Sequence, residues 1–246
     1  MSILTKAVRR LNADMKEYRA GPIEGTAVYQ CEDPMTRLYI AIAGPKDSAY
    51  YGGIYFFQFD IPDTYPNEPP KGKFINWQNT KNRMHPNLYV DGKLCLSILG
   101  TWSGPSWTSA MTISTIILAI QSILDENPLR NEPGYDKNAA SLEHQKYHRI
   151  VQYYNYRDFA LKSIEMCYKP SVLNKNYEFI LYLKDFVVDY YLKNREMILS
   201  ELKKLLELYP KSSLVSTSYQ QCNATIDYLV LIEQWDLCFQ QFLANF

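Results

Sequence analysis

The chain has 246 residues, 47% of them hydrophobic and 21% charged, so it can bury a full core and is neither collagenous nor a disordered tail. Its 26 basic residues balance its 26 acidic ones, so no net field draws it to nucleic acid or to an acidic membrane. The longest apolar run, residues 38–43, is far below the roughly 18 residues of a membrane span.

The first predicted element is an amphipathic helix whose apolar stripe runs from Ile3 to Tyr18 and whose outer face is basic. Short turn-rich loops separate the β-rich runs that follow, which predicts an antiparallel meander. Four clustered prolines then take the chain out of the sheet before it returns for a fourth strand. The four predicted strands are residues 26–31, 37–43, 54–60 and 73–75.

Residues 79–110 have few regular signals, and a long irregular stretch inside a compact domain is usually functional. Residues 112–124 are nearly all apolar and predict a buried crossover helix, and 141–168 predict a further helix. Beyond it we expect two or three amphipathic helices, with a Ser-rich break at 211–218. The predicted organisation is therefore a domain at 1–169 and a helical C-terminal extension at 170–246.

The cysteines are odd in number, widely spaced and without a CxxC pair: Cys31, Cys95, Cys167, Cys222 and Cys238. This pattern predicts neither a disulfide framework nor a zinc site, and it favours a reducing compartment, the cytoplasm or the nucleus. His144 and His148 lie one helical turn apart but lack a third ligand, so we interpret them as an exposed polar face. No metal and no cofactor is expected.

Cys95 is the most informative cysteine because it lies in the irregular stretch, eight residues after Asn87 and beyond an Asp-Gly turn. A cysteine in such chain can be a nucleophile, and a nearby asparagine can donate amide hydrogens to a developing oxyanion. The alternative from chemistry alone is a core cysteine and a turn-capping asparagine.

The segment from His85-Pro-Asn87 through the Asp-Gly turn to Cys95-Leu-Ser-Ile-Leu resembles the active-site segment of ubiquitin-conjugating enzymes. Flanking motifs occur in the family's order: Gly-Pro at 44–45 with Gly-Gly at 52–53, Tyr-Pro at 65–66 with Pro-Pro at 69–70, Trp107, Thr-Ile-Ser at 112–114 and Asn-Pro at 127–128. The resemblance covers roughly residues 1–165. It is strongest to the subgroup with the extended segment CLSILGTWxGPxW, here 95–107, which includes the Z-type conjugating enzyme.

The resemblance implies an α/β (α+β) fold with an N-terminal helix, a four-stranded antiparallel meander, an active-site loop and a crossover helix, followed here by the helical extension. It implies that Cys95 takes ubiquitin or a ubiquitin-like modifier from an activating enzyme as a thioester and passes it to a lysine or a ligase. Asn87 would stabilise the tetrahedral intermediate or hold the loop. His85 would fix the Asn87 turn or act as a general base, and we favour the first role.

The family's partners are a ubiquitin-like modifier, a ubiquitin-activating enzyme and a ubiquitin ligase. The resemblance places the activating enzyme on the basic face of the N-terminal helix, at Lys6, Arg9 and Arg10. Many members have an acidic residue two positions after the cysteine, where this chain has Ser97, and another after the Asn-Pro pair, where it has Leu129 and Arg130. Nearby acids that could compensate are Asp125, Glu126, Glu132 and Asp136.

Two rival functions remain open. The first is a non-catalytic variant of the same fold that only binds ubiquitin, and the retention of both Cys95 and Asn87 argues against it. The second is a cysteine hydrolase that pairs Cys95 with His85, for which no orienting third group is visible.

Overall fold

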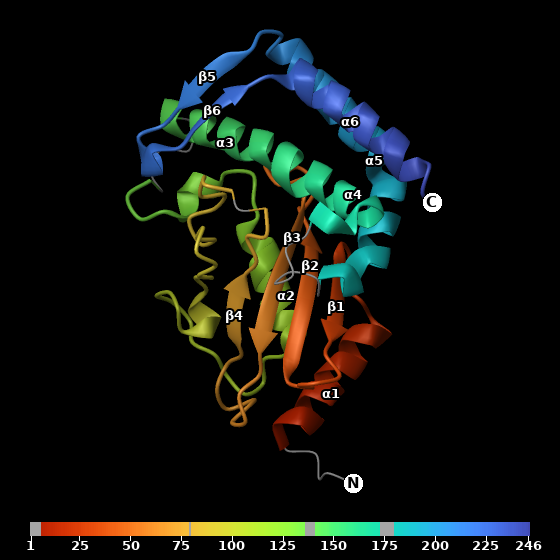
Figure 1. Cartoon of the computed structure of the whole chain (residues 1–246). Coiled ribbons are helices and arrows are strands. Elements are labelled where there is room, and N and C mark those ends of the chain that lie inside the picture. The colour runs from red at the N-terminus through yellow and green to blue at the C-terminus, as the bar shows by residue number, and fades with distance from the viewer. Residues whose placement is uncertain (1–5, 79, 136–140, 173–179) are drawn as a thin grey trace.

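The computed structural model of the protein describes residues 6–78, 80–135, 141–172 and 180–246 (Figure 1). At its centre is a four-stranded antiparallel sheet in the order β1-β2-β3-β4. These strands are Thr26–Gln30, Arg37–Ala43, Ile54–Asp60 and Lys71–Phe74. The order confirms the predicted meander. Consecutive rather than alternate residues are buried in β2 and β3, so both faces of the sheet are covered there.

The fourth strand begins at Lys71, earlier than predicted, directly after two prolines. At Gly72 the backbone passes so close to Phe59 of β3 that an added Cβ would lie 2.3 Å from the phenyl ring. A glycine therefore lets β4 pair with β3 here, although its usual preference for turns had hidden the start of the strand.

The predicted N-terminal helix and crossover helix are both present, and they pack against each other. α1, Lys6–Ala20, buries an apolar stripe that includes Leu11 and Met15 and contacts α2. The predicted first stripe residue, Ile3, lies outside the described residues. α2, Ile113–Ile123, confirms the crossover helix, and its first turn is closed by the Thr112 N–H, which donates to the Thr115 hydroxyl at 3.2 Å.

The helix predicted at 141–168 is continuous but contains one wider turn. α3, Leu142–Tyr154, leads into a π-helical turn, η3 (Asn155–Ala160), and then into α4, Leu161–Tyr168. Asn155 is fully buried in this turn, where it accepts a bond from the Tyr55 hydroxyl and donates one to the Tyr51 carbonyl. The wider turn therefore brings a polar side chain onto the sheet, which an apolar periodicity does not predict.

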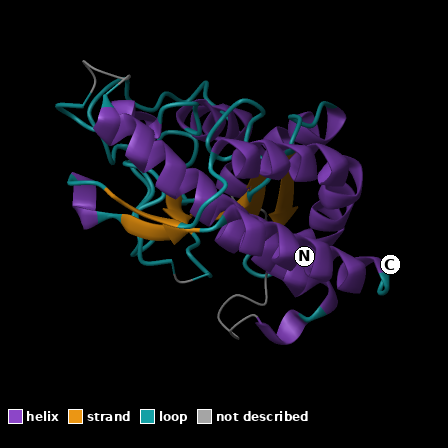
Figure 2. Ribbon diagram, turned by 90° about the horizontal axis from the view of Figure 1, so that it is seen from above, coloured by secondary structure: helices purple, strands orange, loops and turns teal. Residues whose placement is uncertain are grey.

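The C-terminal part contains two long helices, α5 (Lys184–Leu208) and α6 (Tyr228–Leu243), after a short turn, η4 (Pro170–Val172). The predicted Ser-rich break between helices is confirmed, since α5 ends at Leu208 and α6 begins at Tyr228. Within it, residues 213–226 form a hairpin that was not predicted, made of β5 (Ser213–Ser216), η6 (Tyr219–Gln221) and β6 (Asn223–Ile226). Its alternate residues are buried, and Figures 1 and 2 both show it running along α3. Ser216 and Asn223 lie at exposed positions, and such small polar residues give little sign of a strand.

α5 and α6 pack against α4 and against each other, and one hydrophobic core runs from the sheet into both helices. The boundary between 169 and 170 therefore stays a prediction, since packing crosses it. Among the described residues, no helix is both long and apolar enough to span a bilayer.

Candidate active site

Residues 85–95 fold back on themselves into a small loop that ends at Cys95. Leu88 bridges to Leu94, and the turn between them is closed by the Lys93 N–H, which donates to the Asp91 carboxylate at 3.0 Å. Gly92 takes a φ of +93°, which glycine adopts without strain, and its carbonyl accepts the Phe74 N–H at 2.9 Å. The loop is thus attached to the end of β4.

The structure brings Asn87 and Cys95 together, as their spacing predicts. The Cys95 N–H donates to the Asn87 carbonyl at 2.9 Å, and the Asn87 side-chain amide donates to the Cys95 carbonyl at 2.7 Å. Asn87 is 6% exposed and Cys95 is 1% exposed, so neither bond competes freely with water. Asn87 therefore holds the loop around the cysteine, whatever else its amide does.

His85 lies beneath this pair and is fully buried. Its Nδ1 accepts the backbone N–H of Asn87 at 2.9 Å, so a neutral ring carries its proton on Nε2. Burial lowers the pKa of His85 to about 3, because the charged imidazolium would lose its hydration. A general base needs a free lone pair and a pKa near the working pH. These contacts favour the loop-fixing role over the general-base role.

Thr101 is a residue of this site that sequence reasoning missed. Its hydroxyl accepts the Leu96 N–H at 2.9 Å and donates to the Leu94 carbonyl at 2.8 Å, so it ties the backbone on both sides of Cys95. The chain reaches this position through Gly100, which has a φ of +70°. A Gly-Thr pair shortly after the cysteine is the available signal, but it looks like any surface turn.

The residues after Thr101 fold back beside the cysteine segment. A Cβ added at Gly104, which has a φ of +135°, would lie 3.0 Å from the Ser97 side chain. Farther along, the Trp107 indole N–H donates to the Pro66 carbonyl at 2.7 Å, and its ring contacts Tyr65. The tryptophan thus pins this segment to the proline-rich loop before β4.

The acids that could compensate for Ser97 are mostly engaged elsewhere. Asp125 accepts the Asn127 N–H at 2.8 Å and the Asn131 side-chain amide at 3.1 Å, which closes the chain after α2. Glu132 accepts the Tyr219 hydroxyl at 3.0 Å. Glu126 is exposed, and Asp136 lies outside the described residues. Asp125 and Glu132 therefore serve structural contacts.

The basic face of α1 differs from the prediction at one residue. Lys6 and Arg9 are exposed, but Arg10 is not part of that solvated face. Its guanidinium pairs with the buried Asp14 at 2.7 Å and donates to the carbonyls of Ser109 and Met111, each at 2.8 Å. The buried carboxylate draws Arg10 inward, so that it links α1 to the segment before α2.

All five cysteines lie within the described ranges and are free thiols. Burial raises the pKa of Cys167 to about 12 and that of Cys238 to about 11, which makes them poor nucleophiles. The exposed-face prediction is wrong for His144, which is 3% exposed because its ring packs against Tyr135 and its Nδ1 bonds to Ser141.

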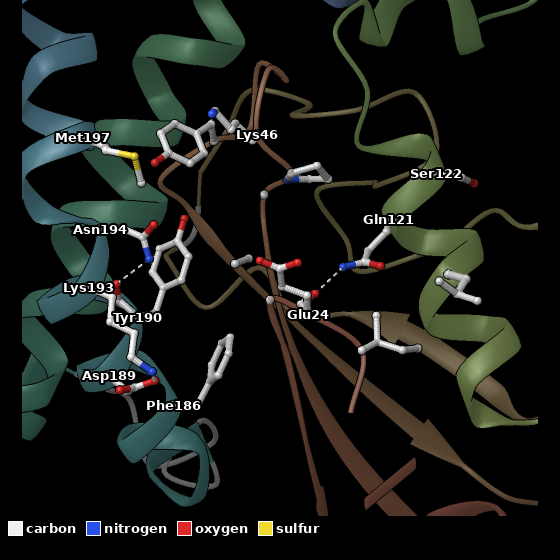
Figure 3. Close-up of a pocket in the computed structure, with 17 residues that line it drawn as sticks. Glu24, Lys46, Gln121, Ser122, Phe186, Asp189, Tyr190, Lys193, Asn194 and Met197 are labelled. Atoms are coloured by element: carbon white, nitrogen blue, oxygen red, sulfur yellow. Dashed lines mark hydrogen bonds and ion pairs between the residues drawn. The ribbon is translucent and has the colours of Figure 1, made fainter. Parts of the chain in front are cut away.

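A cavity of about 970 Å³ lies elsewhere, between α2 and α5 (Figure 3). Gln121 of α2 and Asp189, Lys193 and Asn194 of α5 line it, and Lys193 pairs with Asp189 at 2.7 Å. The described residues that line this cavity do not include Cys95, Asn87 or His85. The cavity therefore lies between the extension, α2 and the loops at 23–25 and 43–46, apart from the Cys95 loop.

Comparison with known proteins connects this geometry to one family. A family model described as "Ubiquitin-conjugating enzyme" matches residues 10–155. "Ubiquitin-conjugating enzyme E2 Z" of Xenopus tropicalis is 36% identical over 169 residues, or 68% of this chain and 54% of that protein. The Homo sapiens protein of the same name is 38% identical over 144 residues, or 58% and 41%. "Probable ubiquitin-conjugating enzyme E2 24" of Arabidopsis thaliana is 31% identical over 221 residues, or 86% and 23%. The chain spans about half the length of the E2 Z relatives it matches.

Proposed function

The chain belongs to the ubiquitin-conjugating enzyme family, and from that premise we propose that it accepts ubiquitin or a ubiquitin-like modifier from an activating enzyme as a Cys95 thioester. It then passes the modifier to a lysine or to a ligase. The observation that carries this proposal is the pair of reciprocal hydrogen bonds between Asn87 and Cys95. They hold a thiol and an amide donor in one loop, as acyl transfer through a cysteine requires.

In the first step the Cys95 thiolate attacks the carbonyl carbon of the thioester on the activating enzyme, and that enzyme's thiolate leaves. In the second step an amine or a ligase thiolate attacks the Cys95 thioester, the Cys95 thiolate leaves, and an attacking amine also loses a proton. Both steps pass through a tetrahedral intermediate with a negatively charged oxygen. Asn87 has a second amide hydrogen beyond the one bound to the Cys95 carbonyl, and that hydrogen would serve this oxygen.

The choice of acceptor follows from the acids around the site. Ser97 carries no carboxylate, and Asp125 and Glu132 are bound to protein partners. We therefore expect thioester formation to be efficient and discharge onto free lysine to be slow. Transfer to a ligase thiol, which needs no base for an amine, would be the faster route.

The proposal also assigns roles to α1 and to the two parts of the chain, and a compartment to the protein. The exposed Lys6 and Arg9 on α1 would contribute to the surface for the activating enzyme, while Arg10 keeps the adjoining segment in place. Residues 1–169 would form the catalytic domain and 170–246 its extension. The five free thiols suit a reducing compartment, so we place the protein in the cytoplasm or the nucleus.

A non-catalytic ubiquitin-binding role is the alternative. It predicts ubiquitin affinity without a covalent adduct. The presence of Cys95 and Asn87 together in one loop favours catalysis, since a binding module has no need of a thiol there.

The decisive experiment is to incubate the full chain with ATP, each candidate modifier and its activating enzyme. We expect a reductant-sensitive adduct that Cys95→Ala abolishes and that Cys95→Ser converts to a reductant-resistant, alkali-labile oxyester. Serine at Cys167 or Cys222 serves as the control and should leave the thioester. An adduct on Cys95→Ala would refute the assignment of the nucleophile.

A further inference from the structure

The Arg83 side chain contacts the turn that precedes Cys95 at two places. Its guanidinium donates a hydrogen bond to the carbonyl of Pro86, which stands between His85 and Asn87. The same group lies 3.6 Å from the centre of the Tyr89 ring, on the far side of that turn. A planar cation stacked on a ring and bonded to a carbonyl has little freedom, so Arg83 restrains the backbone on both sides of Asn87.

Arg83 is in turn held from the C-terminal side of the molecule. Its carbonyl accepts the hydroxyl of Tyr147 on α3 at 2.6 Å, and the Tyr147 ring meets Tyr219 of the hairpin edge-on, with 5.0 Å between centres. Next to Arg83, the Asn82 side chain donates to the Asn223 carbonyl of β6 at 3.3 Å. One direct bond and one path through Tyr147 thus join the hairpin to the segment 82–83.

Contacts within and around the hairpin tip, residues 217–221, hold Tyr219 in place. Gln220 and Gln221 both have a φ of +51°, a left-handed conformation that non-glycine residues adopt only when surrounding contacts impose it. Glu143 of α3 holds the residues just before them by accepting bonds from the Thr217 hydroxyl at 2.7 Å and the Ser218 N–H at 2.9 Å. Strained backbone that is held in this way often marks a functional position.

We propose that the C-terminal hairpin, residues 213–226, holds the turn beside Cys95 in its working geometry and that Arg83 is the positioning residue through which it acts. The extension would then be part of the active site's support rather than only a stabilising layer. This inference rests on the proposed function, in which Cys95 must meet an incoming thioester in a fixed orientation.

The first test does not depend on activity. In the full chain, the rate of iodoacetamide alkylation at Cys95 is measured by peptide mass spectrometry relative to that at Cys167, an equally buried thiol beneath the extension helices. Because local opening exposes only the loosened segment, Arg83→Ala and Tyr219→Ala should each raise the Cys95 to Cys167 ratio about tenfold. Global destabilisation would raise the Cys167 rate at least as much as the Cys95 rate and would not raise the ratio.

The second test is the rate of single-turnover charging by the activating enzyme. Each variant should charge about tenfold more slowly, and the double variant little more slowly than either, because the two residues act through one contact chain. Tyr191→Phe is the matched control. It removes a 3.0 Å bond from α5 to the Gly52 carbonyl and a 3.4 Å bond to the Phe159 carbonyl, extension contacts that do not involve Arg83, and it should change neither the Cys95 alkylation rate nor the charging rate.

If Tyr219→Ala does not fold, Glu143→Ala loosens the same tip without a core cavity and should move both readouts in the same direction. Unchanged alkylation ratios, multiplicative effects in the double variant, or an equal effect of Tyr191→Phe would each overturn the inference. If no modifier charges the unmodified protein, the proposed function fails, and the alkylation ratio still decides whether the hairpin positions the turn.

Discussion

The loop around Cys95, residues 85–101, and the α5–α6 layer keep their shapes by different means. In the loop, His85, Asn87 and Thr101 each bond to a backbone group at 2.7 to 2.9 Å. The layer is held by apolar burial, and Trp235 and Phe239 are fully inaccessible. Directional bonds fix a few atoms at modest net free energy, whereas burial contributes much free energy without fixing any one atom. Changes in the loop should therefore alter rates, and changes in the layer should alter stability.

The largest expected effect is in the layer. Trp235→Ala removes a fully buried indole that contacts Tyr191 and Phe239, and such truncations cost about 3 to 5 kcal/mol of unfolding free energy. In a protein of this size that corresponds to a fall in Tm of roughly 10 °C. Thermal denaturation measures it. Charging at 20 °C, corrected for the folded fraction, should stay close to that of the unmodified protein.

The matched control for this substitution is Leu237→Ala on the same helix. Leu237 is 59% exposed, so its removal should change the unfolding free energy by less than about 0.5 kcal/mol. If Trp235→Ala loses more of its charging rate than of its folded fraction, the layer also affects the rate, and the expected separation of stability from rate is wrong.

Asn87→Ala is the corresponding change in the loop, and it should lower a rate more than it lowers stability. The variant should still form the thioester, but discharge should slow about a hundredfold, or about 3 kcal/mol, because one donor to the oxyanion is lost. A single-turnover discharge assay, run beside a melting curve, measures both consequences. If the asparagine only holds the loop, Tm falls while discharge is largely intact.

A nearby asparagine provides the control. The Asn76 side-chain amide donates to the carbonyls of Thr80 and Val90 at 3.0 Å each, so it also closes a loop by two backbone bonds. Asn76→Ala should therefore lower Tm without the hundredfold loss of rate. Equal slowing in both variants would assign the effect to loop closure.

The pH dependence of stability gives a smaller effect that reports on His85. Its pKa is about 3 in the folded protein and near 6.5 when unfolded, so below about pH 6.5 the unfolded state binds the extra proton. The stabilisation is thus fully present above that pH. As pH falls toward 4 it is lost at about 1.4 kcal/mol per unit. Urea unfolding at pH 7 and pH 5 measures the slope, and His85→Gln should flatten it. An identical slope in that variant would contradict the assignment.

The parts of the fold that follow from local pattern could be predicted from the sequence. The first three strands, α1 and α2 each carry their own residue pattern and turn signals, whereas Gly72 hid the start of β4. The β5–β6 hairpin and the inward position of Arg10 could not, because both depend on residues distant in the chain: α3 for the hairpin, and the Ser109 and Met111 carbonyls for the arginine. Cys95, Asn87 and His85 were found through their motif, whereas Thr101 acts through a hydroxyl that no pattern distinguishes.

Thr101 separates the effect of hydrogen bonds in the loop from that of burial. Thr101→Val keeps the shape of the side chain but removes the hydroxyl that bonds Leu94 and Leu96 on either side of Cys95. Because the residue is exposed, water can replace part of these bonds, and the loss of unfolding free energy should be only about 1 kcal/mol. If directional bonds in the loop set the rate, charging should slow several-fold although Tm falls by only a few degrees. Thr101→Ser, which retains the hydroxyl, should restore the rate. If the charging rates of both variants change only as their Tm values do, the loop depends on burial rather than on these hydrogen bonds.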